Sequence, residues 1–329
     1  MGYSIFPLVF DTPVHFGNVE LGGDLSSCTI EYSSDTLVGA LLHELSEYGD
    51  EELLVSVRDK LCQHQIIFSD LLPYVRSGDG EYNLYLPKPI LMGKRKPLAK
   101  ELDTVRKMAT KLKKQKKMAY IRASRMKEYM ESIMQCGDFT EDVSFYDTAL
   151  MERVNMRGDE PLPYFVGSCN FRANAGMYVI AYTEYDDDKV LIKRLLKYVL
   201  RGGIGGKRSS GYGKARLSDD ISEYNSDWKE ILSMLDDSDK GWQMSISSII
   251  PEESELDIVQ QGFYKLKDRG GFVSSFGTED VKKNSVSVLS SGSCFPNRIA
   301  GKKVILSNRG NKPVERFGTG LFVGLGIYE

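Results

Sequence analysis

Sixteen consecutive residues, 201–216, carry the strongest chemical signal in this sequence. Six of them are glycine, five are lysine or arginine, and none is acidic. Glycine lets backbone amides approach a ligand closely, because no Cβ intervenes and positive φ angles are allowed. This composition predicts binding to a chain of phosphates. The side chains available for that task are Lys207, Arg208, Ser209, Ser210, Lys214 and Arg216.

The spacing of these glycines does not fit two common nucleotide-binding loops. A P-loop read back from Lys207 has Arg201 where its first glycine belongs, and one read back from Lys214 has Arg208 there. A dinucleotide fingerprint read from Gly203 or Gly211 lacks its third glycine. The loop also follows a helix-like run, whereas the dinucleotide loop follows a strand. The sequence therefore argues against both sites, and a flexible surface loop is the plain alternative.

Composition describes an ordinary globular chain. Of its 329 residues, 41% are hydrophobic and 27% are charged, and two domains are the expectation for this length. We expect no membrane span, because no apolar run approaches about 20 residues, and no signal peptide. The five cysteines are scattered without a Cys-x-x-Cys pair, which argues against a disulfide framework and a zinc site. A reducing cytoplasm is the expected setting.

Charge is distributed very unevenly along the chain. Residues 94–127 contain fourteen lysines and arginines against two acids, a local charge of +12 within a chain of net charge −3. An acidic body with one basic segment favours a specific anionic partner together with protein neighbours. The alternative is a solvated helical face or a disordered insertion.

Hydrophobic patterning predicts an α+β chain. Tyr3–Phe10 has the composition of a strand, Ser34 or Asp35 begins a helix, and apolar residues in 189–200 recur at helical spacing. The remaining elements expected in the first domain are a helix over 51–63 and strands over 161–166, 176–182 and 214–218. Shorter strands are expected over 242–250, 263–267, 286–289, 303–306 and 321–327.

Several motifs together resemble one family. A helix, a loop of glycines and cations and then a strand resemble the glycine-rich loop of the RAMP superfamily of CRISPR proteins. Further segments resemble, more narrowly, the subunit that caps the 5′ end of the guide RNA (crRNA) in type III-A (Csm) effectors. These segments are Leu8–Gly17, Ser34–Leu41, Tyr85–Pro89, Pro163–Val166 before Phe171, Val314–Gly318 and Gly320–Gly324.

The resemblance implies tandem ferredoxin-like (βαββαβ) domains with long insertions. Residues 1–218 would form the first domain, with a basic insertion at 94–127 and a thumb-like hairpin at 151–163. An acidic linker at 219–239 and a second domain at 240–329 would follow. The implied partners are the repeat-derived 5′ tag of the guide RNA, the large signalling and nuclease subunit, a backbone RAMP subunit and, indirectly, target RNA. No cofactor or metal is implied.

The resemblance also implies which residues bind RNA. Phosphates would meet the amides of residues 202–206 and the side chains of Lys207, Arg208 and Lys214. Tyr212 would either stack on a splayed base or pack under the loop. Arg153 and Arg157 of the hairpin would make weaker contacts. The full set is His15, Gly202, Gly203, Gly205, Gly206, Lys207, Arg208, Ser209, Ser210, Gly211, Tyr212, Gly213, Lys214, Arg153 and Arg157.

Catalysis is not expected from this sequence. His15 follows the first strand, where some RAMP ribonucleases carry a general base, so a metal-independent endoribonuclease that processes precursor guide RNA is the alternative. We interpret His15 instead as an RNA contact or a packing residue. Asp35, at a position resembling the early-loop aspartate of backbone subunits, is explained more simply as a helix N-cap. A phosphate-binding metabolic enzyme is disfavoured by the failed loop spacings.

Overall fold

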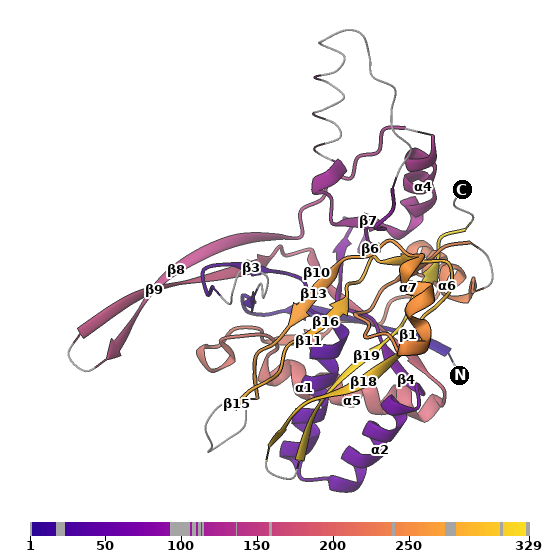
Figure 1. Cartoon of the computed structure of the whole chain (residues 1–329). Coiled ribbons are helices and arrows are strands. Elements are labelled where there is room, and N and C mark those ends of the chain that lie inside the picture. The colour runs from indigo at the N-terminus through magenta and orange to yellow at the C-terminus, as the bar shows by residue number, and fades with distance from the viewer. Residues whose placement is uncertain are drawn as a thin grey trace.

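The chain is built around a central antiparallel sheet (Figure 1). The computed structural model describes residues 2–17, 24–92, 106, 110, 113, 115–135, 137–157, 160–238, 241–273, 281–309 and 312–326. The sheet has the order β11-β1-β10-β5-β6-β7, with β4 also paired to β10. Its strands are β1 (Gly2–Phe10), β4 (Ile66–Phe68), β5 (Leu72–Arg76), β6 (Tyr82–Pro87), β7 (Tyr120–Arg122), β10 (Ala175–Thr183) and β11 (Ala215–Leu217).

Both faces of this sheet are covered, as the alternation along β10 shows. Met177 and Val179 belong to a core formed with three helices, whereas Tyr178 and Ile180 belong to a second core on the opposite face. Successive strand residues point to opposite faces, so an almost wholly buried strand must be apolar on both. The helices of the first core are α1 (Ser34–Tyr48), α2 (Glu51–Cys62) and α5 (Asp186–Gly202).

The second core joins the C-terminal part of the chain to the central sheet. It contains residues of the strands β12 and β20 and of two further helices. These elements are α4 (Met126–Met134), α6 (Ser226–Asp236), β12 (Gln243–Ser245) and β20 (Phe322–Gly324). The other C-terminal elements are α7 (Leu256–Gln260), β13 (Leu266–Arg269), β14 (Phe272–Val273), β15 (Val281–Lys282), β16 (Val286–Leu289), β17 (Cys294–Phe295), β18 (Gly301–Arg309) and β19 (Lys312–Thr319).

The expected α+β class is confirmed, but one strand lies elsewhere than predicted. The strand expected at 161–166 is part of β9 (Glu160–Phe171), which pairs along its whole length with β8 (Tyr146–Arg157). These two strands form a separate sheet that projects from the body (Figure 1). The place beside β10 is taken by β5 instead. The hairpin expected at 151–163 is therefore longer than its motif indicated.

The acidic stretch 219–239 is not simply an exposed linker. Its residues 226–236 form α6, whose apolar side chains Trp228, Ile231 and Leu235 are buried in the second core. Their spacing of three and four residues places them on one face of the helix, so the acids occupy mainly the other. Asn225 caps the helix by accepting from the amide of Trp228 at 2.9 Å.

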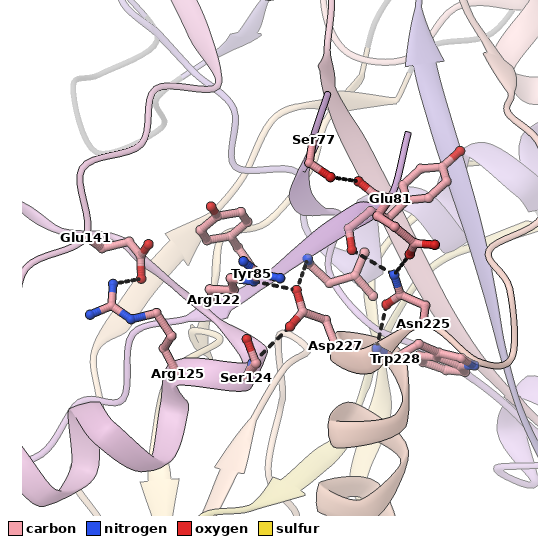
Figure 2. Close-up of polar contacts among 12 residues, drawn as sticks. Ser77, Glu81, Tyr85, Arg122, Ser124, Arg125, Glu141, Asn225, Asp227 and Trp228 are labelled. Atoms are coloured by element: carbon pink, nitrogen blue, oxygen red, sulfur yellow. Dashed lines mark hydrogen bonds and ion pairs between the residues drawn. The ribbon is translucent and has the colours of Figure 1, made fainter. Parts of the chain in front are cut away.

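Asp227 on this helix holds the sheet edge in place (Figure 2). Its buried carboxylate accepts from the backbone amide of Leu84 and the Arg122 guanidinium, both at 2.9 Å, and from the Ser124 amide at 3.2 Å. One carboxylate thus joins α6 to β6, to β7 and to the turn after β7. Because a buried charge is tolerated only when it is paired and hydrogen-bonded, these contacts depend on one another.

We predict that Asp227→Ala lowers the free energy of unfolding by about 3–5 kcal/mol, since it leaves the buried Leu84 amide, the Ser124 amide and the Arg122 guanidinium without their acceptor. Asp220→Ala is the matched control. Asp220 pairs with Lys193 at 2.8 Å, but its side chain is 71% exposed, so its loss should cost less than about 1 kcal/mol. Urea unfolding of both variants measures the difference, and equal losses would contradict the assigned role of Asp227.

Candidate nucleic-acid interface

The glycine-rich loop runs from the end of α5 to β11 through a series of left-handed turns. Gly203, Gly205, Gly211 and Gly213 all have φ between 75° and 88°. Lys207 also has a positive φ, 59°, and begins a short 3-10 turn at residues 208–210. Side-chain-bearing residues rarely adopt this conformation, so the number of glycines follows from the path of the backbone.

The loop packs directly against the chain that follows β1. The amide of Gly206 donates to the His15 carbonyl at 2.8 Å, and that of Gly213 donates to the Pro13 carbonyl at 2.8 Å. The loop also closes on itself, because the Ile204 amide donates to the Gly213 carbonyl at 3.0 Å. A Cβ placed on Gly213 would lie only 1.9 Å from the Ile204 carbonyl oxygen.

These contacts correct the expectation that the amides of residues 202–206 face a ligand. Gly202 lies in the last turn of α5, and the Gly203 amide bonds the Leu200 carbonyl at 3.2 Å. Gly205 lies against the chain after β1, because a Cβ placed on it would come within 2.5 Å of the Phe16 ring. Farther along the loop, the amides of Lys207, Arg208 and Ser209 have no acceptor among the residues that the structure describes. The amides that can meet an anion therefore lie at 207–209.

Two cation–aromatic contacts join the loop to the hairpin. The Lys207 ammonium lies 5.1 Å from the ring centre of Tyr164 on β9, and the Arg153 guanidinium on β8 lies 5.7 Å from that of Tyr212. Arg153 and Tyr164 are opposite one another in the hairpin ladder. Tyr164 was missed by motif reasoning. The signal that reveals it is register, because cross-strand partners share one face of a hairpin.

The cations of this region have no acidic partners within the described part of the chain. Lys207, Arg208, Lys214 and Arg153 form no salt bridge there, and the Nε atom of Arg153 is buried without an acceptor. Lys214, Ser209 and Ser210 are exposed. Unpaired cations around unsatisfied amides produce a local positive potential, the electrostatic requirement for binding a phosphate backbone.

Tyr212 packs under the loop rather than facing solvent. Its side chain is only 5% exposed, and its hydroxyl lies 3.9 Å from the Met151 sulfur of the hairpin. Of the two roles considered for this tyrosine, packing is the one that its burial favours. A base could stack on the ring only after the loop and hairpin separated.

His15 is likewise a packing residue. It is 4% exposed, and its Nδ1 atom lies 2.7 Å from the carbonyl oxygen of Gly167 on β9, to which it donates. A Cβ on Gly206 would come within 2.8 Å of the imidazole. The ring therefore fills the space between the loop and the hairpin base, and of the two roles expected for His15 this burial favours packing.

Asp35 is not the N-cap that the sequence suggested. The helix begins after Ser33, and Asp35 occupies its first turn, where its buried carboxylate pairs with Arg316 on β19. Arg316 is 281 residues away in sequence, so a local sequence pattern could not predict this ion pair. No group of three or more metal-ligating side chains occurs among the described residues.

Two predicted regions lie partly outside the described residues. Arg157 ends β8, and its side chain is not among those described. Within the basic segment 94–127, the structure describes residues 106, 110, 113 and 115–127. Of these, Arg122 is committed to Asp227, and Arg125 pairs with Glu128 at 2.9 Å and Glu141 at 3.1 Å. These two arginines therefore serve the fold.

Comparison with known proteins agrees with the fold. Residues 238–325 match the family model described as the CRISPR Csm4 C-terminal domain. A relative from Streptococcus thermophilus, "CRISPR system Cms protein Csm4", is 26% identical over 308 residues, which are 92% of either chain.

Solved structures share the architecture. A chain in the crystal structure of the Csm3-Csm4 subcomplex of the type III-A CRISPR-Cas interference complex matches with a TM-score of 0.60 and 15% identity, over 98% of this chain and 99% of that one. A chain of the Csm1-Csm4 cassette in complex with cA4 matches with a TM-score of 0.59 and 15% identity over the full length of both.

These matches make the chain similar to the RAMP-type subunits of CRISPR effectors. Within that class, residues 238–325 match the Csm4 C-terminal domain and the whole chain is similar to Csm4 proteins, as the sequence motifs indicated. No helix in the described part of the chain is both long enough and apolar enough to cross a membrane.

We predict that Gly213→Ala disrupts the loop, whereas Gly211→Ala does not. Both glycines have left-handed φ angles, 75° and 87°, so both variants incur a backbone strain of about 1 kcal/mol. Only at Gly213 does the added methyl meet backbone, whereas nothing lies within 4 Å of a Cβ at Gly211. Thermal unfolding should show a clearly larger loss for Gly213→Ala, and equal midpoints would contradict the close packing.

Proposed function

We propose that this chain binds the 5′ repeat-derived tag of a guide RNA and caps that end of a type III-A effector without catalysing a reaction itself. The observation that carries the proposal is the cluster of unpaired cations, Lys207, Arg208, Lys214 and Arg153, around the free amides at 207–209. Phosphate oxygens are acceptors only, and this cluster offers donors and positive charge only.

The sheet order supports the ferredoxin-like interpretation of the first domain. A βαββαβ chain forms a sheet of order 4-1-3-2, and β11-β1-β10-β5 has that order when β5 is taken as the second strand. Helices α1 and α5 then cover one face together. We infer that the C-terminal part is a reduced domain of the same type, reached through the acidic stretch 219–239.

We further propose that the chain joins two protein neighbours in the cytoplasm. The solved relatives are a Csm1-Csm4 cassette and a Csm3-Csm4 subcomplex. By analogy, this chain would bridge the large signalling and nuclease subunit to the first backbone subunit. The acidic surface outside the basic segment supplies charge for protein contacts.

The hairpin provides a route to the target RNA. One of its faces, given by the ladder register, meets the loop through Met151 and Arg153. The opposite face carries exposed apolar side chains, with Leu150 at 60%, Val154 at 58% and Phe165 at 48% exposure, beside the exposed Glu152. We propose that the hairpin lies against the guide and separates a base pair with the target, since apolar side chains can replace base stacking.

The nuclease alternative is less well supported. A general base must reach the proton that it removes, and His15 is buried with one ring nitrogen committed to the Gly167 carbonyl. We therefore expect purified chain to leave tagged guide RNA intact.

We predict that Lys207→Ala/Arg208→Ala weakens the binding of a labelled guide RNA with its 5′ tag and makes that binding less dependent on salt. Each lost phosphate contact removes about 0.7 from the slope of log affinity against log salt, so the slope should fall by about 1.4. Fluorescence anisotropy over a range of salt concentrations measures both quantities, and gel analysis of the same samples reports whether the RNA is cut.

Lys189→Ala/Lys193→Ala is the charge-matched control. These residues lie on the outer side of α5, away from the loop, and Lys193 pairs with Asp220. An equal loss of RNA affinity in both double variants would show that only the net charge matters and would contradict the proposed site. Cleavage of the RNA by the wild-type chain that His15→Ala abolishes would instead favour the processing nuclease.

A further inference from the structure

Two cysteines far apart in sequence meet at the base of the hairpin. Cys28 lies on β3 (Cys28–Thr29) and Cys169 on β9, 141 residues later, yet their sulfur atoms are 3.1 Å apart. Cys169 is fully buried, whereas Cys28 is partly exposed. The Cys28 sulfur is thus accessible to a reagent from solvent, and the Cys169 sulfur lies directly behind it.

The backbone on both sides of this pair is already held together. β3 pairs with β2 (Phe16–Gly17), and Cys169 exchanges two 2.9 Å backbone hydrogen bonds with Val14. The Gly167 amide also donates to the Leu25 carbonyl at 2.8 Å. A disulfide needs its sulfurs about 2.05 Å apart, so an inward movement of about 1 Å joins them without a rearrangement of the strands.

We propose that Cys28 and Cys169 are a modification site: a reversible disulfide forms between them when the chain meets a small disulfide oxidant such as oxidised glutathione. Neither the scattered cysteine positions nor any motif in the sequence indicates this pairing. The proposed disulfide does not depend on whether the chain binds RNA.

The chemistry proceeds by two thiol–disulfide exchanges. The Cys28 thiolate attacks one sulfur of oxidised glutathione, which forms a mixed disulfide and releases one glutathione thiolate. Cys169 then attacks the Cys28 sulfur, releases the second glutathione and passes its proton to that leaving thiolate. Two protein thiols are oxidised to one disulfide, and one glutathione disulfide is reduced to two thiols.

The electrostatics of the pair favour this order of events. The hydrogen bond from Cys169 lowers the pKa of the Cys28 thiol. The same hydrogen bond, together with burial, raises the pKa of Cys169. The more exposed sulfur is therefore also the one that ionises first, and the thiolate is the attacking species.

A disulfide here would tie the segment after β1 to the hairpin. Val14 adjoins His15, whose carbonyl holds the glycine loop and whose ring holds Gly167. The new bond would span the same junction covalently and would close a loop of about 140 residues in the unfolded chain. Oxidation should therefore raise the melting midpoint, by about 5 °C or more.

The test treats the full chain with oxidised glutathione and maps its disulfides by mass spectrometry without reduction. We expect a linked peptide pair containing Cys28 and Cys169 in most of the molecules, a raised melting midpoint, and reversal of both by dithiothreitol. Cys28→Ser should abolish the linked pair and the shift. Cys62→Ser, at an exposed position on α2, should retain both.

Glutathione adducts that persist on Cys28 without a linked pair would overturn the proposal, because they would show that Cys169 does not resolve the mixed disulfide. Oxidation confined to Cys62 or Cys136 would overturn it equally. Since the readout is covalent, failure of this proposal is distinguishable from failure of RNA binding, and neither result depends on the other.

Discussion

The closest approach of backbone to backbone in the glycine-rich loop governs the site around it. At Gly213 and Gly206 the loop comes so near to Ile204 and His15 that a methyl group would not fit. In this packing the early amides of the loop donate hydrogen bonds within the protein, whereas those of residues 207–209, at the outer turn, do not. The packing also aims Lys207 at the hairpin. The positions of the loop cations Lys207, Arg208 and Lys214 therefore depend on a steric constraint that only glycine meets.

Buried carboxylates hold the N-terminal and C-terminal parts of the chain together. Asp227 joins α6 to the edge of the central sheet, and Asp35 pairs with Arg316 on β19. Asp70 accepts from the backbone amides of Ser34 and Ser248, at 2.8 and 3.0 Å. Desolvation raises the pKa of Asp70. Such charges discriminate strongly between the correct and an altered docking of the two halves, because an unpaired one is costly in the interior.

The sequence predicted the local elements well and their partners poorly. Helical and strand periodicity located β1, α1, α2, α5 and β11 within a few residues, because those signals are contained in short windows. It assigned 161–166 to the wrong sheet and Asp35 to a cap, because strand pairing and the Arg316 ion pair connect distant residues. The glycine loop was located by its composition. Three features could not be predicted: the inward-facing amides of the loop, the contact of Lys207 with Tyr164, and the Cys28–Cys169 pair. They arise where distant parts of the chain come together in the fold, and residue spacing in the sequence does not encode that.

We propose that the outer turn of the loop and the adjoining hairpin hold the 5′ tag of the guide RNA. Photo-crosslinking tests it most directly: a guide RNA carrying 4-thiouridine at single tag positions is irradiated with the full chain, and the attached peptides are identified by mass spectrometry. If these elements hold the tag, crosslinks form within residues 207–214 and on the hairpin near Arg153 and Tyr164, and none form when thiouridine lies at the far end of the guide. Crosslinks confined to the basic segment 94–127, with residues 207–214 unlabelled, would contradict it.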